Sequence, residues 1–237
     1  MTPYTPEFYA HRHESTVYSA EVILPLVLKK LPPVHAAIDI GCGVGTWLSV
    51  LRQHGVADIH GCDGDWVDRG VLSIPPECFE HIDLSRCIPS VQRRYDLAIS
   101  LEVAEHLPAT RAAQFVSFLT ALADHVLFSA AIPGQGGTHH VNEQWPRYWA
   151  ELFEARGYRS VDCIRPHVWH DAKIPFWYRQ NALLFVNRGL PDGIETSQMP
   201  LDLVHPELYR SHTQPGVRGS FKLFCQSMSS YFKKSVS

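Results

Sequence analysis

Three glycines at alternate positions and two carboxylates carry the clearest chemistry in this sequence. Gly41, Gly43 and Gly45 follow Asp39, and Asp63 stands twenty residues after Gly43. Glycine has no Cβ, so the backbone here can approach a ligand closely and turn sharply. Such a turn directs backbone N–H groups and the start of the following helix at an anionic group. A carboxylate at position 63 can accept hydrogen bonds from both hydroxyls of a ribose.

The spacing of the glycines argues against a dinucleotide site. A dinucleotide fingerprint requires G-x-G-x-x-G, whereas Thr46 stands where its third glycine would be. Asp39 would repel a pyrophosphate, but its carboxylate can accept a hydrogen bond from an ammonium group or a water. The pattern favours a ligand with an amino-acid end and disfavours an NAD-dependent oxidoreductase.

Histidines after two later apolar runs could act as general bases. His106 follows the run 95–101, and His140 lies in the segment 134–145, which combines glycines, polar residues and a tryptophan. An imidazole titrates near neutral pH and can take the proton of a hydroxyl nucleophile. We therefore expect His140 and His106 to be catalytic, with Asn142 or Glu143 in a polar role. The alternative is a hydrogen-bond network that only anchors the loop.

No metal site is expected. His139 or His140 with Glu143 has the spacing of ligands on one helical face, but only two or three ligands are visible and no second cluster accompanies them. The six cysteines are scattered without a C-x-x-C pair, which indicates reduced thiols rather than a zinc site or a disulfide framework.

Apolar runs alternate with helical patterns along most of the chain. Strands are expected at 36–40, 58–62, 78–82, 95–101, 125–131, 161–164 and 182–186. Helices are expected at 17–31, 46–52, 110–123 and 145–156. Strands that alternate with helices pair in parallel through right-handed crossovers, so the pattern predicts an α/β three-layer sandwich.

Composition narrows the class of protein. The chain has 237 residues, 45% of them hydrophobic and 19% charged, which is typical of a globular protein with a sizeable core. The net charge of -3 disfavours a nucleic-acid partner, because phosphate neutralisation needs a basic surface. No apolar run is long enough to span a membrane, and the N-terminus lacks the layout of a signal peptide. We expect a cytoplasmic protein without a membrane partner.

In these motifs the sequence resembles the class I S-adenosylmethionine-dependent methyltransferases. The resemblance lies in four segments in the family's order and spacing, at residues 38–47, 61–63, 82–84 and 95–107, and it covers roughly residues 35–190. It implies a Rossmann-like, seven-stranded, mostly parallel sheet whose last strand is antiparallel. It also implies S-adenosylmethionine as cofactor and S-adenosylhomocysteine as product. The cofactor-binding residues that it implies are Asp39, Gly41, Cys42, Gly43, Asp63, Asp83, Leu84 and Leu101.

Each of these residues has an implied part. The glycines pass close to the methionine end with Asp39 nearby, and Asp63 holds the ribose. Asp83 and Leu84 frame the adenine, although Asp83 also suits a simple turn carboxylate. Leu101 lines the side of the sulfonium.

The expected function is methyl transfer to an oxygen or nitrogen of a small-molecule acceptor such as a natural product, sugar or quinone. The alternative is a protein that binds S-adenosylmethionine without transferring its methyl group, or that uses it for other chemistry. We expect residues 1–190 to form the methyltransferase domain, with 1–31 as a helical lid. Residues 191–237 are expected to form an extension with a terminal helix, through which a homodimer could assemble.

Overall fold

The computed structural model describes residues 6–86, 88–187 and 199–214, with side chains from His13 onward. Seven strands form one sheet in the order β3-β2-β1-β4-β5-β7-β6. Strands β1 to β5 are parallel, and β7 runs antiparallel to both β5 and β6. The predicted fold class is therefore confirmed. The strands are β1 (Ala36–Ile40), β2 (Asp58–Asp63), β3 (Phe79–His81), β4 (Leu97–Leu101), β5 (His125–Ser129), β6 (Tyr158–Val161) and β7 (Leu183–Asn187).

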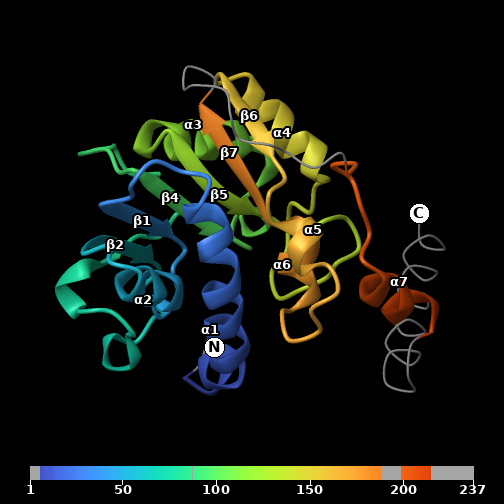
Figure 1. Cartoon of the computed structure of the whole chain (residues 1–237), viewed down its shortest axis with the longest axis horizontal. Coiled ribbons are helices and arrows are strands. Elements are labelled where there is room, and N and C mark those ends of the chain that lie inside the picture. The colour runs from blue at the N-terminus through green and yellow to red at the C-terminus, as the bar shows by residue number, and fades with distance from the viewer. Residues whose placement is uncertain (1–5, 87, 188–198, 215–237) are drawn as a thin grey trace, which may run out of the picture. The chain divides into compact units, whose positions relative to one another are not determined.

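Helices cover both faces of the sheet (Figure 1). One face carries α1 (Pro6–Leu28), α2 (Thr46–Gln53), α5 (Arg165–Val168) and α6 (Phe176–Asn181), and the other carries α3 (Ala112–Leu122) and α4 (Pro146–Glu154). The described residues also form four short 3-10 turns: η1 (Arg69–Val71), η2 (Pro76–Cys78), η3 (Ala104–His106) and η4 (Ala109–Arg111).

Alternating strand residues build two separate cores. Along β1, Ala37 faces the core under α1 and α2, whereas Ile38 faces the core under α3 and α4. On the second face Phe153 of α4 stacks on Phe185 of β7, with ring centroids 3.9 Å apart. Because the two packed faces hold the sheet between them, the carboxyl ends of β1, β2 and β4 keep a fixed arrangement.

The sixth strand and the first helix differ from their predicted bounds, and α5 and α6 were not predicted. The sixth strand was expected at 161–164 but spans Tyr158–Val161. Gly157, with φ of 81°, ends the turn after α4. Tyr158 enters the sheet at once, and its hydroxyl proton is shared between two carbonyl oxygens near the end of α3. The first helix begins at Pro6 rather than near residue 17, and it continues through Pro25.

The chain divides into two compact units, residues 1–202 and 203–237. In the second unit, α7 (Pro206–Thr213) was not predicted. Its start carries a recognisable signal, since Pro206 stands at the first helical position and Nδ1 of His205 accepts the N–H of Glu207. The expected terminal helix and the expected boundary at 190/191 lie outside the described residues, so both stay predictions.

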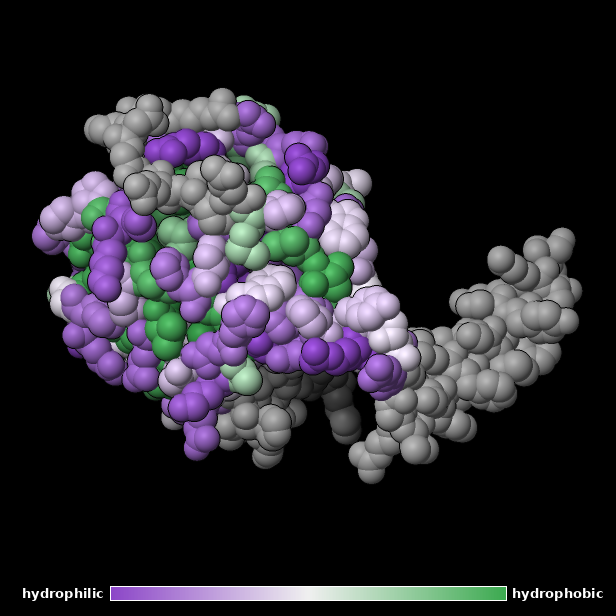
Figure 2. Space-filling view, turned by 45° about the vertical axis from the view of Figure 1, so that its right-hand side comes forward, coloured by the Kyte–Doolittle hydropathy of each residue, from purple (hydrophilic) through white to green (hydrophobic). Residues whose placement is uncertain are grey.

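Among the described residues, no helix is long and apolar enough to cross a membrane. On the face shown in Figure 2, hydrophobic residues appear in several separate areas between hydrophilic ones.

Candidate active site

The glycine turn joins β1 to α2 and is tied to the end of β2. Gly41, Gly43 and Gly45 have φ of 82°, 55° and 81°, values that side chains disfavour. The carbonyl oxygen of Cys62 accepts the N–H of Gly41 at 2.7 Å and that of Cys42 at 3.1 Å. These hydrogen bonds fix the turn beside the carboxyl end of β2, as the sequence predicted.

Asp63 closes the other side of the turn. Its Oδ2 accepts the N–H of Gly43 at 2.7 Å, and its Oδ1 accepts the N–H of Gly64 at 2.7 Å. Burial raises the pKa of this carboxyl, while the two backbone donors and the Trp66 side chain act in the opposite direction. Each carboxylate oxygen can accept a second hydrogen bond, so Asp63 retains acceptor capacity for ligand hydroxyls.

Asp39 lies on β1, where it pairs with Gly61 of β2 and with Ile99 of β4. Its side chain is 2% exposed, and Oδ2 has no hydrogen-bond partner among the described residues. Burial and the neighbouring Asp63 raise the pKa of this carboxyl well above its usual range. A buried, unsatisfied carboxyl oxygen is costly, and a cationic ligand group would satisfy it.

The other expected cofactor residues lie around the same strand ends. Cys42, Leu84 and Leu101 are buried. Asp83 closes its own turn, because Oδ1 accepts the N–H and the hydroxyl of Ser85, and Oδ2 pairs with Arg86 at 3.0 Å. These contacts lower the pKa of Asp83. Its expected place beside an adenine stays a prediction.

A turn after β4 packs directly against the glycine turn. A Cβ added at Gly41 would lie 2.3 Å from Cγ2 of Val103, which shows how closely the Val103 side chain packs on the Gly41 backbone. In the same turn Glu102 has φ of 56°, a strained value for a side chain of this size. Its carboxylate accepts hydrogen bonds from the amides of Gln135 and Asn181, at 2.7 and 3.1 Å. The turn thus links the glycine turn to α6 and to the loop after β5.

The loop at 134–145 is docked on this turn by hydrogen bonds. The carbonyl oxygen of Glu105 accepts the N–H of Val141 at 2.9 Å and that of Asn142 at 3.0 Å. Within the loop, the Glu143 carboxylate accepts the N–H groups of Gly134 and Gly136, at 2.8 and 2.7 Å. Glu143 therefore anchors the loop, which matches the alternative that the sequence left open for it.

Glu105, His106 and His140 form a cluster at the centre of this arrangement, the histidine cluster. One ligand-type atom from each lies within 4.8 Å of the others. The rings of His106 and His140 meet edge to face with centroids 4.9 Å apart. The loop and the turn thus bring together both histidines that the sequence singled out.

Both carboxylate oxygens of Glu105 are buried and have no hydrogen-bond partner within the described part of the chain. Nε2 of His140 lies 3.9 Å from Oε1 of Glu105. Burial and the charge of Glu102 raise the pKa of Glu105 well above its usual range. Burial also lowers the pKa of His106 to about 4, so this imidazole is neutral at physiological pH.

Hydrogen bonding orients His140 within the cluster. Its Nδ1 lies 2.9 Å from Oε1 of Glu143, and its Nε2 is directed toward Glu105. A histidine held by a carboxylate in this way is a common arrangement for a base and for a metal ligand. The expectation that the chain holds no metal is untested, but this cluster could hold a divalent cation.

Sequence reasoning missed two acidic residues of the site. Glu102 and Glu105 were not singled out, although two acidic residues three apart directly after a buried strand were a usable signal. The partners Gln135, Gln180 and Asn181 join one amide network with Glu102. No spacing connects these amides, because they come from the loop after β5 and from α6.

A family model described as a methyltransferase domain matches residues 10–163. The chain belongs to the S-adenosylmethionine-dependent methyltransferase domains. This establishes the class of enzyme and its cofactor, as the resemblance implied. No curated protein sequence matches this methyltransferase.

Solved structures share its fold. Magnesium protoporphyrin IX methyltransferase from Synechocystis PCC 6803 is 20% identical, with a TM-score of 0.55 over 79% of this chain and 89% of that chain. A sugar N-methyltransferase from Streptoalloteichus sp ATCC 53650 is 14% identical, with a TM-score of 0.58 over 77% and 92%. An amino pentose methyltransferase from Micromonospora echinaspora is 12% identical, with a TM-score of 0.56 over 79% and 99%.

The close approach at Gly41 generates the first prediction. Gly41→Ala should weaken S-adenosylmethionine binding by the methyltransferase at least tenfold, because its Cβ would meet Val103 2.3 Å away at a strained φ. Gly55→Ala is the matched control, since Gly55 has φ of 90° but nothing within 4 Å of an added Cβ. Calorimetric titration measures both affinities. Equal affinities in the two variants would show that the Gly41–Val103 contact does not shape the site.

His106 generates a prediction about pH. Because its folded pKa of about 4 lies below the reference value of 6.5, the unfolded chain binds more protons between these values. Protonation therefore destabilises the fold as pH falls from 6.5 to 4, by at most about 3 kcal/mol from this group. His106→Gln should lose less free energy of unfolding over this interval than the wild type. Urea denaturation at several pH values tests this, and parallel curves for the two proteins would refute it.

Proposed function

We propose that this methyltransferase transfers the methyl group of S-adenosylmethionine to an oxygen or nitrogen of a small molecule such as a natural product, a sugar or a quinone. The observation that supports this most is the histidine cluster, which adjoins the glycine turn through Val103. The net charge of -3 favours a neutral or cationic small acceptor over a nucleic acid, because phosphate groups would be repelled. A cytoplasmic location is part of the same proposal.

The charged groups and hydroxyls of the cofactor can be matched to side chains around the glycine turn. S-adenosylmethionine carries an ammonium group and a sulfonium, both cationic. We propose that Asp39 receives the ammonium end, because its buried Oδ2 lacks a partner. Asp63 then accepts the ribose hydroxyls while keeping its hydrogen bonds to Gly43 and Gly64. Leu84 and Leu101 supply apolar contacts, and Cys42 lies within the turn itself.

Methyl transfer is a displacement at carbon. The acceptor oxygen or nitrogen forms a bond to the methyl carbon while the carbon–sulfur bond breaks, and the electron pair leaves with S-adenosylhomocysteine. The acceptor proton must pass to a base, and His140 suits this role because Glu143 holds its Nδ1 at 2.9 Å while its Nε2 faces the rest of the cluster. The main contribution of the protein is alignment of the acceptor with the methyl group.

Glu105 favours a second mechanism at the same cluster. A divalent cation held by Glu105, His106 and His140 would satisfy the buried carboxylate that has no partner. The low pKa keeps His106 neutral, as a metal ligand must be. Such a cation would bind the acceptor oxygen and lower the pKa of its hydroxyl. Glu143 would orient the His140 ring through its contact with Nδ1.

Formation of S-adenosylhomocysteine from S-adenosylmethionine and a mixture of phenolic, sugar and amine acceptors tests the proposal. His140→Ala should lower turnover about 100-fold or more, the usual range for loss of a general base or a metal ligand, with cofactor affinity nearly unchanged. His167→Ala is the control, because His167 is exposed on α5. Tight cofactor binding without product from any acceptor would instead support a binding protein.

Chelation separates the two mechanisms. If a cation acts in the histidine cluster, dialysis against a chelator should abolish turnover, and Mn²⁺ or Zn²⁺ should restore it in the wild type but not in Glu105→Gln. If His140 acts alone as a base, the dialysed enzyme should keep its rate. Full activity in His140→Ala would exclude both roles for this residue.

A further inference from the structure

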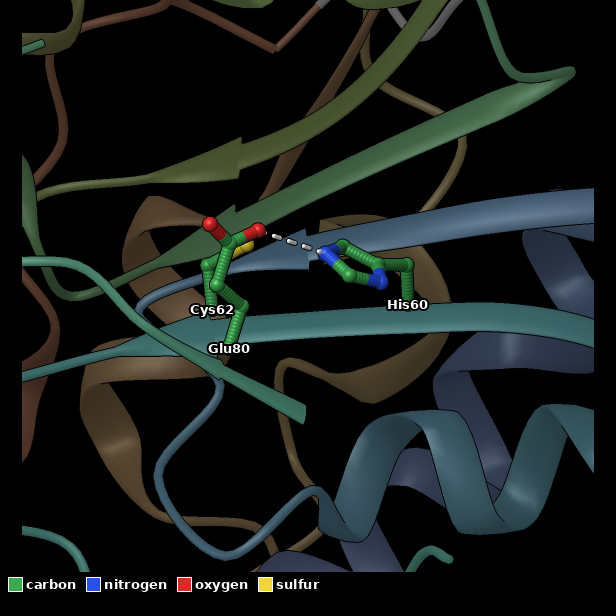
Figure 3. Close-up of side chains that lie close together, drawn as sticks. All are labelled: His60, Cys62 and Glu80. Atoms are coloured by element: carbon green, nitrogen blue, oxygen red, sulfur yellow. Dashed lines mark hydrogen bonds and ion pairs between the residues drawn. The ribbon is translucent and has the colours of Figure 1, made fainter. Parts of the chain in front are cut away.

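A second group of metal-ligating side chains stands at the edge of the sheet, away from the histidine cluster. His60 and Cys62 belong to β2, and Glu80 belongs to the edge strand β3. Cys62 and Glu80 are register partners, and His60 lies two residues before Cys62, so all three side chains project from one face. Figure 3 shows them converging above the two strands. We call these residues the edge cluster.

The spacing of the edge cluster suits a single ion. One ligand atom from each residue lies within 4.8 Å of the other two. Nε2 of His60 is 3.3 Å from Oε2 of Glu80. Around a tetrahedral zinc with bonds of about 2.1 Å to nitrogen and oxygen, these two atoms would be about 3.4 Å apart. Sγ of Cys62 lies within 4.8 Å of both atoms and supplies the third ligand atom.

Burial and charge at the edge cluster also favour a cation. The Cys62 side chain is buried, whereas the Glu80 side chain is 61% exposed, so a water could reach the fourth position from solvent. The Glu80 carboxylate supplies negative charge that attracts a divalent ion, and the bound ion would displace the thiol proton of Cys62 into solvent.

We propose that His60, Cys62 and Glu80 bind a zinc ion, with a water as its fourth ligand. Thiolate and imidazole ligands together select zinc over magnesium or calcium, which prefer oxygen ligands. The site is independent of the proposed chemistry at the histidine cluster, which contains no thiol. It lies on the strand whose end, at Cys62 and Asp63, holds the glycine turn.

Cobalt substitution tests the proposal in the full chain. After dialysis against a chelator, titration with Co²⁺ should produce the near-ultraviolet charge-transfer absorption of a cobalt–thiolate bond, saturating at one ion per chain for that band. Zn²⁺ should then abolish the band. Cys62→Ser should eliminate it, and Glu80→Gln should weaken Co²⁺ binding at least tenfold. Cys163→Ser, another buried thiol on the described part of the chain, should leave it intact.

Two results would overturn the proposal: a wild-type protein that shows no thiolate band with Co²⁺, or a band that survives Cys62→Ser. Thermal unfolding followed by circular dichroism shows whether Cys62→Ser folds. If it does not, the weaker band expected of Glu80→Gln decides, because Glu80 is mostly exposed. Cobalt bound only at the histidine cluster would give visible absorption without a thiolate band, lost in His106→Ala, and would count against the edge cluster.

Discussion

Three hydrogen bonds between the glycine turn and the end of β2, with a fourth within that strand end, determine the arrangement of this active site. The carbonyl of Cys62 holds the N–H groups of Gly41 and Cys42, and the carboxylate of Asp63 holds those of Gly43 and Gly64. Without these hydrogen bonds, the backbone N–H groups of the turn and the carboxylate of Asp63 would lack partners within the protein. Because they satisfy one another, the turn, the strand end and the proposed ribose carboxylate form one rigid piece of structure.

Carboxyl groups dominate the electrostatics around that piece. Burial raises the pKa of Asp39, Glu102 and Glu105. Their hydrogen bonding differs, because amide donors satisfy Glu102, whereas oxygens of Asp39 and Glu105 lack partners among the described residues. A site with unsatisfied acidic groups is suited to cationic ligands. This agrees with a cofactor that carries a sulfonium and an ammonium, and with a divalent ion or a basic acceptor beside Glu105.

The sequence predicted the fold and the glycine turn because both depend on local patterns. Gly41, Gly43 and Gly45 adopt positive φ, which their residue type predicts, and Asp63 ends a strand that the sequence predicted. The catalytic side was predicted only in part. His106 and His140 were found, but Glu105 was not, because its significance lies in full burial without a hydrogen-bond partner. The shift of β6 to Tyr158 depends on hydrogen bonds to carbonyls 35 and 38 residues away, which no local pattern reveals.

The central claim is that S-adenosylmethionine binds at the turn 41–45, between the carboxylates of Asp39 and Asp63. Calorimetric titration of S-adenosylmethionine into the wild type and into Asp63→Ala measures this most directly. We predict one binding site per chain in the wild type and at least tenfold weaker binding in Asp63→Ala at a temperature where circular dichroism shows both folded. Equal affinity in the two proteins, or no heat with the wild type, would contradict the account.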